Sequence, residues 1–259
     1  MADAAPSNEK SAIGERAQRV SKHVTSRFFD DTSTGLDRFG SLLALTIASV
    51  VALSLIDVHA IDDSLARGLM SVVLSTTTGF TLVLGFRAAG VAKRGRRVAE
   101  VVVALAFVTS VIALVAEQMG RATTDAWRAD SPTPLWVAIA MIAPVAVIHR
   151  LIEHRTVTIK TLAGAIAAYL LIAIAYCYVY LYVDAVTDHQ FFAQDRPIGS
   201  WEFMYFSLVT ITTLGYGDLS PDGAFGGLLA TSEAVLGQVY LVTFVAMVVG
   251  LLIQQRDPE

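Results

Sequence analysis

The stretch Thr210-Ile211-Thr212-Thr213-Leu214-Gly215-Tyr216-Gly217-Asp218 decides how the C-terminal part of this chain folds. It begins at the end of a short apolar run, Ser200–Ile211, and is followed by a long one, Ala224–Ile253. A helix as short as the first run reaches only about 18 Å, whereas the hydrocarbon core of a bilayer is about 30 Å thick. The pattern predicts a re-entrant helix, then a loop with two glycines, then a helix that crosses a membrane.

The loop is suited to presenting oxygen atoms. A backbone that turns successive carbonyl groups to one side needs unusual angles, which Gly215 and Gly217 adopt without a clash at Cβ. Thr213 adds a hydroxyl at the inner end, and Tyr216 is expected to point away and brace the loop against the short helix. A lone Gly-Tyr-Gly is a weak motif, but its position between a short apolar helix and a spanning one is specific.

The run from Thr213 to Asp218 resembles the signature of the potassium channel family, in which a pore helix is followed by T-x-G-Y-G-D. The resemblance implies that backbone oxygens replace the hydration shell of K⁺. The residues it assigns to K⁺ coordination are Thr213, Leu214, Gly215, Tyr216 and Gly217. Those it assigns to support of the filter are Tyr205, Thr212 and Asp218. One chain supplies one loop, so the resemblance also implies a symmetric homotetramer that conducts K⁺.

The pore helix departs from the family at two places. Tyr205 and Phe206 stand where family members often carry two tryptophans, so only Tyr205 has a hydroxyl with which to hold Asp218. Val209 stands where some members place a buried glutamate, so that contact is absent. These departures concern how tightly the filter is held and leave the implied ion preference unchanged.

The last apolar run carries the residues that the resemblance relates to gating. Gly237 lies 19 residues after Asp218, which matches the hinge glycine of the family's inner helix, and helix packing is an equally good interpretation. Val249 and Ile253 are expected near the cytoplasmic crossing, where apolar side chains can gate by dewetting. For Glu233, an acid deep in this run, we favour a structural contact with the back of the pore helix over a direct role. By the same alignment, Gln238, Leu241 and Val245 are expected to face the pore.

Five more apolar runs qualify as membrane spans, which need roughly 20 residues in a helix. They are Phe39–Ile56, Ala66–Phe86, Val98–Ala116, Leu135–Ile152 and Ile159–Val183. The composition agrees, since 54% of the 259 residues are hydrophobic and 16% are charged, against about 25% charged in soluble domains. The expected fold class is an all-α membrane protein with six transmembrane helices, a re-entrant pore helix and a selectivity-filter loop.

Charge alternates between the loops and predicts the orientation. Arginine and lysine gather at 87–98 and 149–160, whereas 57–65 and 117–134 are acidic or mixed. By the positive-inside rule the basic loops and both termini are cytoplasmic, in a multi-pass protein of the cell (inner) membrane. The expected organisation is a cytoplasmic segment at 1–38, a four-helix transmembrane domain at 39–156 and a pore domain at 157–259.

Six spans with the pore at the end resemble a voltage-gated subunit, but the fourth span lacks a sensor. A sensor carries arginines at every third position, because each charge gains about 2.3 kcal/mol per 100 mV crossed. Leu135–Ile148 contains none, and Arg150 and Arg155 lie at its cytoplasmic end. We therefore expect no voltage gating. The polar cluster Ser75–Gly79 in the second span is interpreted as helix packing, with a ligand pocket as the alternative.

The expected function is passive, selective K⁺ conduction by a homotetramer in contact with membrane lipid. The alternatives are a weakly selective cation channel, a potassium uptake transporter with four pore loops in one chain, and a non-conducting regulatory or scaffold subunit. No enzyme is expected, because the five histidines lack metal-ligand spacing and there is no phosphate loop. A net charge of −4 gives no basic surface for nucleic acid. The single cysteine, Cys177, is expected to be a buried filler.

Overall fold

A computed structural model of the chain describes residues 39–56, 64–88, 93–119, 132–153, 158–187 and 189–254. The first described helix is Phe39–Leu55. The later elements are α2 (Ser64–Ala88), α3 (Lys93–Gln118), α4 (Pro134–Glu153), α5 (Ile159–Val186), α6 (Ser200–Ile211), α7 (Gly223–Val239), the π-helix η2 (Tyr240–Val245) and α8 (Ala246–Gln254). The described residues form no β-strand, so the predicted all-α class is confirmed. The predicted segment 1–38 lies outside the described residues.

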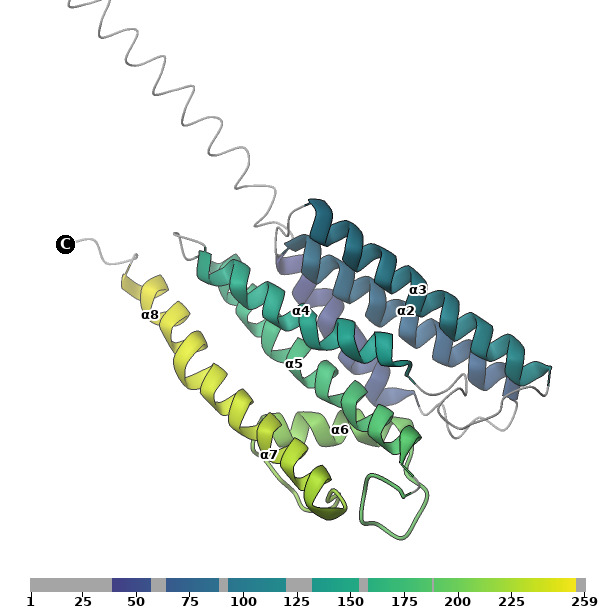
Figure 1. Cartoon of the computed structure of the whole chain (residues 1–259). Coiled ribbons are helices and arrows are strands. Elements are labelled where there is room, and N and C mark those ends of the chain that lie inside the picture. The colour runs from purple at the N-terminus through teal and green to yellow at the C-terminus, as the bar shows by residue number, and fades with distance from the viewer. Residues whose placement is uncertain are drawn as a thin grey trace, which may run out of the picture.

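The helices form two groups that meet at α5 (Figure 1). α2, α3 and α4 pack on one another, α4 also packs along α5, and α5 in turn contacts α6, α7, η2 and α8. The short helix α6 lies crosswise near one end of α5 and α7, while α7 to α8 lies away from α2 and α3 (Figure 1). α5 is therefore the helix that joins the two groups.

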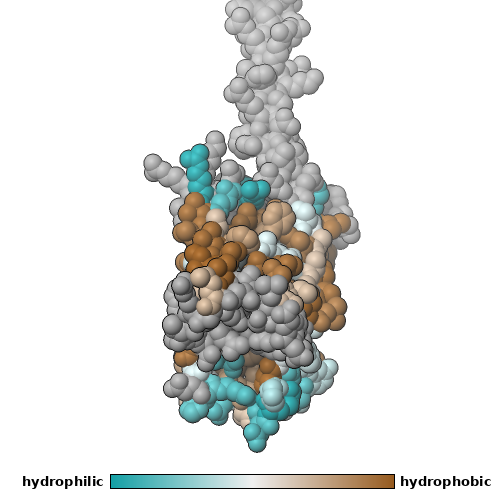
Figure 2. Space-filling view, turned by 90° about the vertical axis from the view of Figure 1, so that its right-hand side faces the viewer, coloured by the Kyte–Doolittle hydropathy of each residue, from teal (hydrophilic) through white to brown (hydrophobic). Residues whose placement is uncertain are grey.

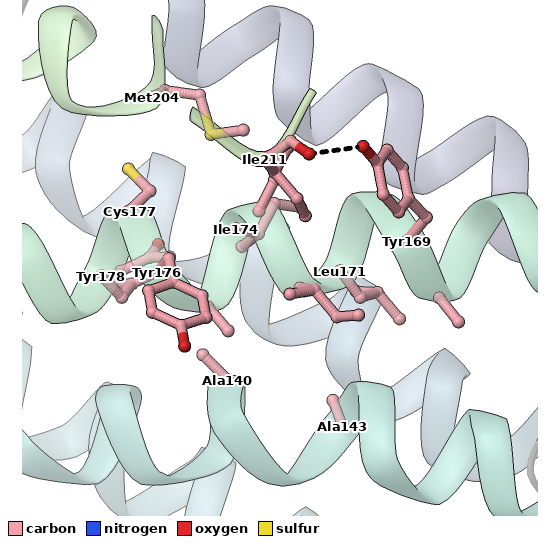
Figure 3. Packing of buried hydrophobic residues seen from close by; sticks show 14 of the residues in the cluster. Ala140, Ala143, Tyr169, Leu171, Ile174, Tyr176, Cys177, Tyr178, Met204 and Ile211 are labelled. Atoms are coloured by element: carbon pink, nitrogen blue, oxygen red, sulfur yellow. Dashed lines mark hydrogen bonds between the residues drawn. The ribbon is translucent and has the colours of Figure 1, made fainter. Parts of the chain in front are cut away.

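Small side chains let α4 and α5 approach each other. Ala140 and Ala143 of α4 are completely buried and lie on its side facing α5, near Tyr176 and Leu171 (Figure 3). Close packing of small residues is a main source of helix association in lipid, where the hydrophobic effect does not act between helices. Cys177 of α5 is buried and forms no disulfide, as predicted for a filler.

Polar side chains and one glycine join α2 to its neighbours. Trp136 of α4 donates its indole N–H to Ser110 Oγ of α3 at 3.1 Å. Its ring lies so close to Gly79 of α2 that a Cβ there would sit 2.5 Å from it. Ser49 of the first described helix shares a 2.8 Å hydrogen bond with Thr81 of α2. The packing role predicted for the cluster in α2 is confirmed at Gly79.

Three of the described helical stretches have both the length and the hydropathy of a membrane span, namely Pro134–Ile152, Ile159–Val186 and Gly223–Leu251. Phe39–Leu55, Val72–Gly85 and Glu100–Ile112 are apolar over shorter lengths. α3 is 26 residues long, but four basic residues near its start lower the hydropathy there. Figure 2 shows hydrophobic residues between hydrophilic ones at both ends of one face. These features support a membrane protein, and six spans remain a prediction.

The last long helix changes its winding half-way. α7 runs directly into η2, where the N–H of Ala246 reaches the carbonyl of Leu241, five residues back, and α8 comes next. The hydroxyl of Thr243 donates to the carbonyl of Val239 within the same segment. π-helical turns of this kind occur mostly inside α-helices and are frequent at functional sites. The sequence predicted one regular helix here, so η2 is a difference from the expectation.

Candidate functional site

The N-terminal end of α6 is held by an acid in its first turn. The carboxylate of Glu202 accepts the backbone N–H of Gly199, the N-cap, at 2.7 Å and a hydrogen bond from Arg196 at 3.0 Å. The Arg196 hydrogen bond holds the pKa of Glu202 below its ordinary value; burial opposes this shift and the Gly199 N–H adds to it. An anion at this position also complements the positive end of the helix dipole.

The middle of α6 is held by a buried polar cluster from three helices. Glu233 of α7 is fully buried, and its carboxyl contacts the hydroxyls of Ser207 of α6 and Tyr180 of α5. Ser207 also lies 2.8 Å from the backbone carbonyl of Ala173. The structural contact predicted between Glu233 and the back of the short helix is confirmed.

A count of protons identifies the form of Glu233 that fits this cluster. The Ser207 hydroxyl carries one proton but contacts two oxygens that otherwise only accept. When Ser207 donates to the Ala173 carbonyl, its contact with Glu233 needs a proton on the carboxyl. Glu233 is in neither of the ion pairs found among the described residues, and an unpaired carboxylate in an apolar interior is costly. The protonated acid therefore satisfies the cluster.

The backbone after α6 alternates in handedness. Thr213, Gly215 and Gly217 have φ of 57°, 54° and 80°, whereas Leu214 and Tyr216 between them have no positive φ. Alternating left- and right-handed residues turn their N–H groups to one side and their carbonyl oxygens to the other. Thr213 is the single non-glycine residue with a positive φ in the part of the chain that the structure describes. Such strain in a β-branched residue is typical of functional segments.

The N–H side of this loop faces α6. The N–H groups of Leu214 and Gly215 reach the carbonyl of Val209 at 2.9 and 3.3 Å. Residues 212–218 are exposed in the single chain, with 56% of Leu214 and 67% of Tyr216 accessible. The predicted K⁺ ligands therefore form one continuous exposed edge, and the N–H groups of its first three residues are bonded to carbonyls of α6.

Aromatic residues connect the Asp218 end of the loop to α6. Tyr205 donates its hydroxyl to Asp218 Oδ2 at 2.7 Å, which is the contact that the sequence predicted. The bond to Asp218 raises the pKa of Tyr205 to about 12. The rings of Tyr205 and Tyr216 stack with centroids 6.5 Å apart and planes 8° from parallel. Tyr216 thus lies against a residue of α6, the short helix that it was expected to brace.

The C-terminal end of α6 is where α5 and α7 come close to the loop. Tyr169 donates its hydroxyl to the carbonyl of Ile211 at 2.9 Å (Figure 3). Thr212, the C-cap, donates its hydroxyl to the carbonyl of Leu208 at 2.6 Å. A Cβ on Gly237 would lie 2.7 Å from the Ile211 carbonyl oxygen. Of the two interpretations of Gly237, the structure supports packing, and a hinge role stays a prediction.

An aromatic stack links this contact to the π-helical segment. The ring centroids of Tyr169 and Tyr240 are 6.1 Å apart, and those of Tyr240 and Phe244 are 5.2 Å apart. Tyr240 also donates its hydroxyl to the carbonyl of Ala165 at 2.9 Å. Because Tyr169 also bonds to the last residue of α6, one ring contact connects η2 with the end of α6.

The residues predicted to face the pore from the last helix do not share one environment. Gln238 is exposed, whereas Leu241 and Val245 pack partly on the core, Val249 is half-buried and Ile253 is 58% exposed. The prediction assumed a regular α-helix, and a π-helical turn shifts the register of the later residues in the helix by about one position. The gating roles of Val249 and Ile253 stay predictions.

Some of the residues that hold the site were not predicted. The Glu202 contact has a local signal, since an acid three residues after a helix N-cap is a common capping pattern. Tyr169 and Tyr240 have none, because their partners lie 42 and 75 residues away along the chain.

Comparisons with known proteins match this part of the chain. A family model described as an ion channel matches residues 166–254, from within α5 to the end of α8. A protein called two pore potassium channel a, from Oryza sativa subsp. japonica, is 37% identical over 54 residues. That match covers 21% of this chain and 16% of the relative, so the similarity extends over a small part of that protein. No solved structure matches. The family match supports an ion channel.

Proposed function

We propose that this chain is one subunit of a K⁺-selective channel whose filter is the backbone of residues 213–217. The observation that carries the proposal is the alternating sign of φ through Thr213, Gly215 and Gly217, with N–H groups bonded back to α6. Carbonyl oxygens arranged in this way can replace the hydration shell of a cation. The similarity to a protein named as a potassium channel supports K⁺ as the ion.

A homotetramer is part of the proposal. One chain provides one row of carbonyl oxygens, and four rows around an axis enclose the ion. The exposure of residues 212–218 supports this, because irregular backbone at membrane depth is stable only when protein or water covers it. The C-terminal end of α6, at Ile211 and Thr212, places the negative end of its dipole next to the inner end of the loop. That dipole favours a cation there.

The proposed topology has six spans, with α6 re-entrant and both termini on the cytoplasmic side of the inner membrane. The basic loops at 87–98 and 149–160 support this orientation. α4 carries Arg150 in its last turn and no lysine or arginine before it, so we propose gating that does not depend on voltage. In this arrangement α7, η2 and α8 together form the inner helix beside the pore.

Cation flux from liposomes that contain the purified chain tests the proposal. We expect K⁺ efflux that Ba²⁺ blocks, Na⁺ efflux far below it, and no steep dependence on an imposed voltage. Equal K⁺ and Na⁺ fluxes would instead indicate a weakly selective cation channel, and no flux of either ion would indicate a non-conducting subunit. A steep voltage dependence would contradict the interpretation of α4.

A further inference from the structure

A cavity of about 340 Å³ lies outside the filter, between α4, α5 and the helix from α7 through η2. Its size falls within the range of small-molecule sites, about 300–1,000 Å³. The wall residues that matter here are Val145 of α4, Tyr176 of α5, and Tyr240, Thr243 and Phe244 of η2. The rest of the wall is aliphatic, apart from one proline.

Water is a poor occupant of this cavity. The polar side-chain groups in its wall are the hydroxyls of Tyr176, Tyr240 and Thr243. Each already has a hydrogen-bond partner within the chain: a serine hydroxyl for the first and backbone carbonyls for the other two. A buried water needs two to four polar partners, which this wall does not offer. The cavity therefore suits an apolar occupant.

The position of the cavity indicates where that occupant comes from. All three helices that form it are long and apolar enough to span a membrane. The wall on α4 includes Pro144, which lies ten residues after the helix start at Pro134, or about 15 Å along the axis. That is the middle of a bilayer about 30 Å thick, where the medium is hydrocarbon. Met141 and Val145 are 41% and 63% exposed, so the cavity opens outward beside them.

We propose that this cavity binds one acyl chain of a membrane lipid, and that the bound chain stabilises the π-helical winding of η2. Tyr240, Thr243 and Phe244 all belong to η2 and all line the cavity. An occupant that contacts them favours the winding that presents them, because a ligand shifts a conformation only through differential contacts. The stack of Tyr240 on Tyr169 then connects the occupant with Ile211, beside the filter. This effect on conduction rests on the proposed channel function, whereas the binding does not.

Photo-labelling of the full chain in liposomes tests the binding. One probe is a phosphatidylcholine with a diazirine half-way along an acyl chain, and a second carries the diazirine beside the headgroup. We expect the mid-chain probe to label peptides from α4 and η2 and the headgroup probe to leave them unlabelled. Val145→Trp places an indole at the opening and should abolish this labelling. Because Val145 is 63% exposed, the larger side chain does not have to enter the core.

Ile152→Trp is the matched control. Ile152 lies two turns further along α4, is 64% exposed and does not line the cavity, so labelling of this variant should equal that of the wild type. Size-exclusion profiles of the two variants and the wild type check that all three assemble alike. An unlabelled wild type, as expected if a second copy covers the cavity, would overturn the inference. Equal labelling of Val145→Trp and the wild type would also overturn it.

Potassium flux from the same liposomes tests the coupling to the filter. Replacing linear acyl chains by methyl-branched ones, whose branches do not fit the cavity, should change flux in the wild type and in Ile152→Trp but not in Val145→Trp. If Val145→Trp loses the labelling but its flux still changes with branched chains as in the wild type, the coupling is overturned. Absence of K⁺ flux from every preparation contradicts the channel proposal itself, and the labelling result then stands independently.

Discussion

α5 and the helix from α7 to α8 are equally apolar, but the rest of the chain buries them to different degrees. Mean hydropathy reaches 2.1 in both Ile159–Val186 and Gly223–Leu251. Within the apolar 18-residue stretch of each, however, 67% of the first is buried and 17% of the second. α5 lies among α4, α6, α7, η2 and α8, whereas among the described elements the last helix packs mainly on α5 and α6. Hydropathy alone therefore does not distinguish a helix inside the subunit from one left open for another partner.

The last helix is buried along a single stripe. Its buried residues are Gly226, Glu233, Gly237, Tyr240, Phe244 and Val248. Most of these recur every three or four residues, so they lie on one face, toward α5 and α6. Leu228, Val235 and Val242 are 65%, 57% and 64% exposed. In a membrane protein such a surface is covered by lipid or by other copies, and the exposed loop at residues 212–218, the proposed filter, favours other copies.

The largest effect is expected in the exposed loop that we propose as the filter. Gly215→Ala forces an alanine to adopt φ of 54°, at a cost of roughly 1–2 kcal/mol, and disturbs the row of carbonyl oxygens. We expect loss of K⁺ flux from liposomes without loss of protein yield. Gly223→Ala is the control, since Gly223 has φ of 66° and open space around it but lies outside the filter. Normal flux in both variants would show that this backbone does not conduct.

The next effect tests whether other copies cover the last helix. Leu228→Asn places an amide on its exposed face, and an amide buried without a partner costs about 1–3 kcal/mol in each subunit. We expect the proposed tetramer to dissociate in detergent, as measured by size-exclusion chromatography with light scattering. Ile166→Asn, on α5 and 41% exposed, should leave the assembly intact. If both variants stay tetrameric, lipid rather than protein covers this part of α7.

Glu233 tests the polar part of the buried stripe. Glu233→Leu leaves the Tyr180 hydroxyl without its acceptor, which costs about 1–3 kcal/mol, and leaves Ser207 with only its bond to the Ala173 carbonyl, so the melting temperature of the purified protein should fall. Glu233→Gln keeps a donor and an acceptor, as the protonated acid does, and should have a much smaller effect. If glutamine is as damaging as leucine, the proton count at Ser207 is wrong.

A smaller effect is expected at Gly237, where the buried stripe of the last helix has no side chain. Gly237→Ala places a Cβ within 2.5 Å of Ile211 Cγ1, and overpacking of this kind costs about 1–3 kcal/mol. Gly227→Ala, in the same helix with nothing within 4 Å, should be neutral or slightly stabilising, because alanine favours a helix. Thermal unfolding in detergent compares the two. Equal melting temperatures would mean that the helix shifts freely away from α6.

The short helix could be predicted to the residue, from Ser200 to Ile211, because its length and the glycine motif after it are both local signals. The contact of Tyr205 with Asp218 could be predicted because the motif places both residues. The π-helical winding could not, since Tyr240-Leu-Val-Thr-Phe-Val245 is as apolar as any spanning helix. In this segment Tyr240 bonds to the Ala165 carbonyl and stacks on Tyr169. Both contacts form only in the folded chain, so no local sequence signal marks them.

The smallest effect is expected at the N-terminal end of α6, where Glu202 pairs with the exposed Arg196. The pKa of Glu202 is lowered mainly by Arg196, so the ionised pair contributes stability above the ordinary carboxyl pKa of about 4.3. That contribution is lost as the pH falls through the lower pKa of the folded state. Because 51% of the Arg196 side chain is exposed, solvent screens the pair and its contribution is small.

Arg196→Gln removes the main cause of the lowered pKa, so melting temperature should begin to fall at a higher pH than in the wild type when measured from pH 7 down to pH 3. Arg196→Lys keeps the charge but not the paired N–H groups that contact both carboxylate oxygens, so its profile should lie between the other two. K⁺ selectivity should not change in either variant, since the pair lies at the opposite end of α6 from Thr213. Superimposable profiles would mean that the Gly199 N–H alone holds Glu202, and that α6 is anchored chiefly by its buried contacts with α5 and α7.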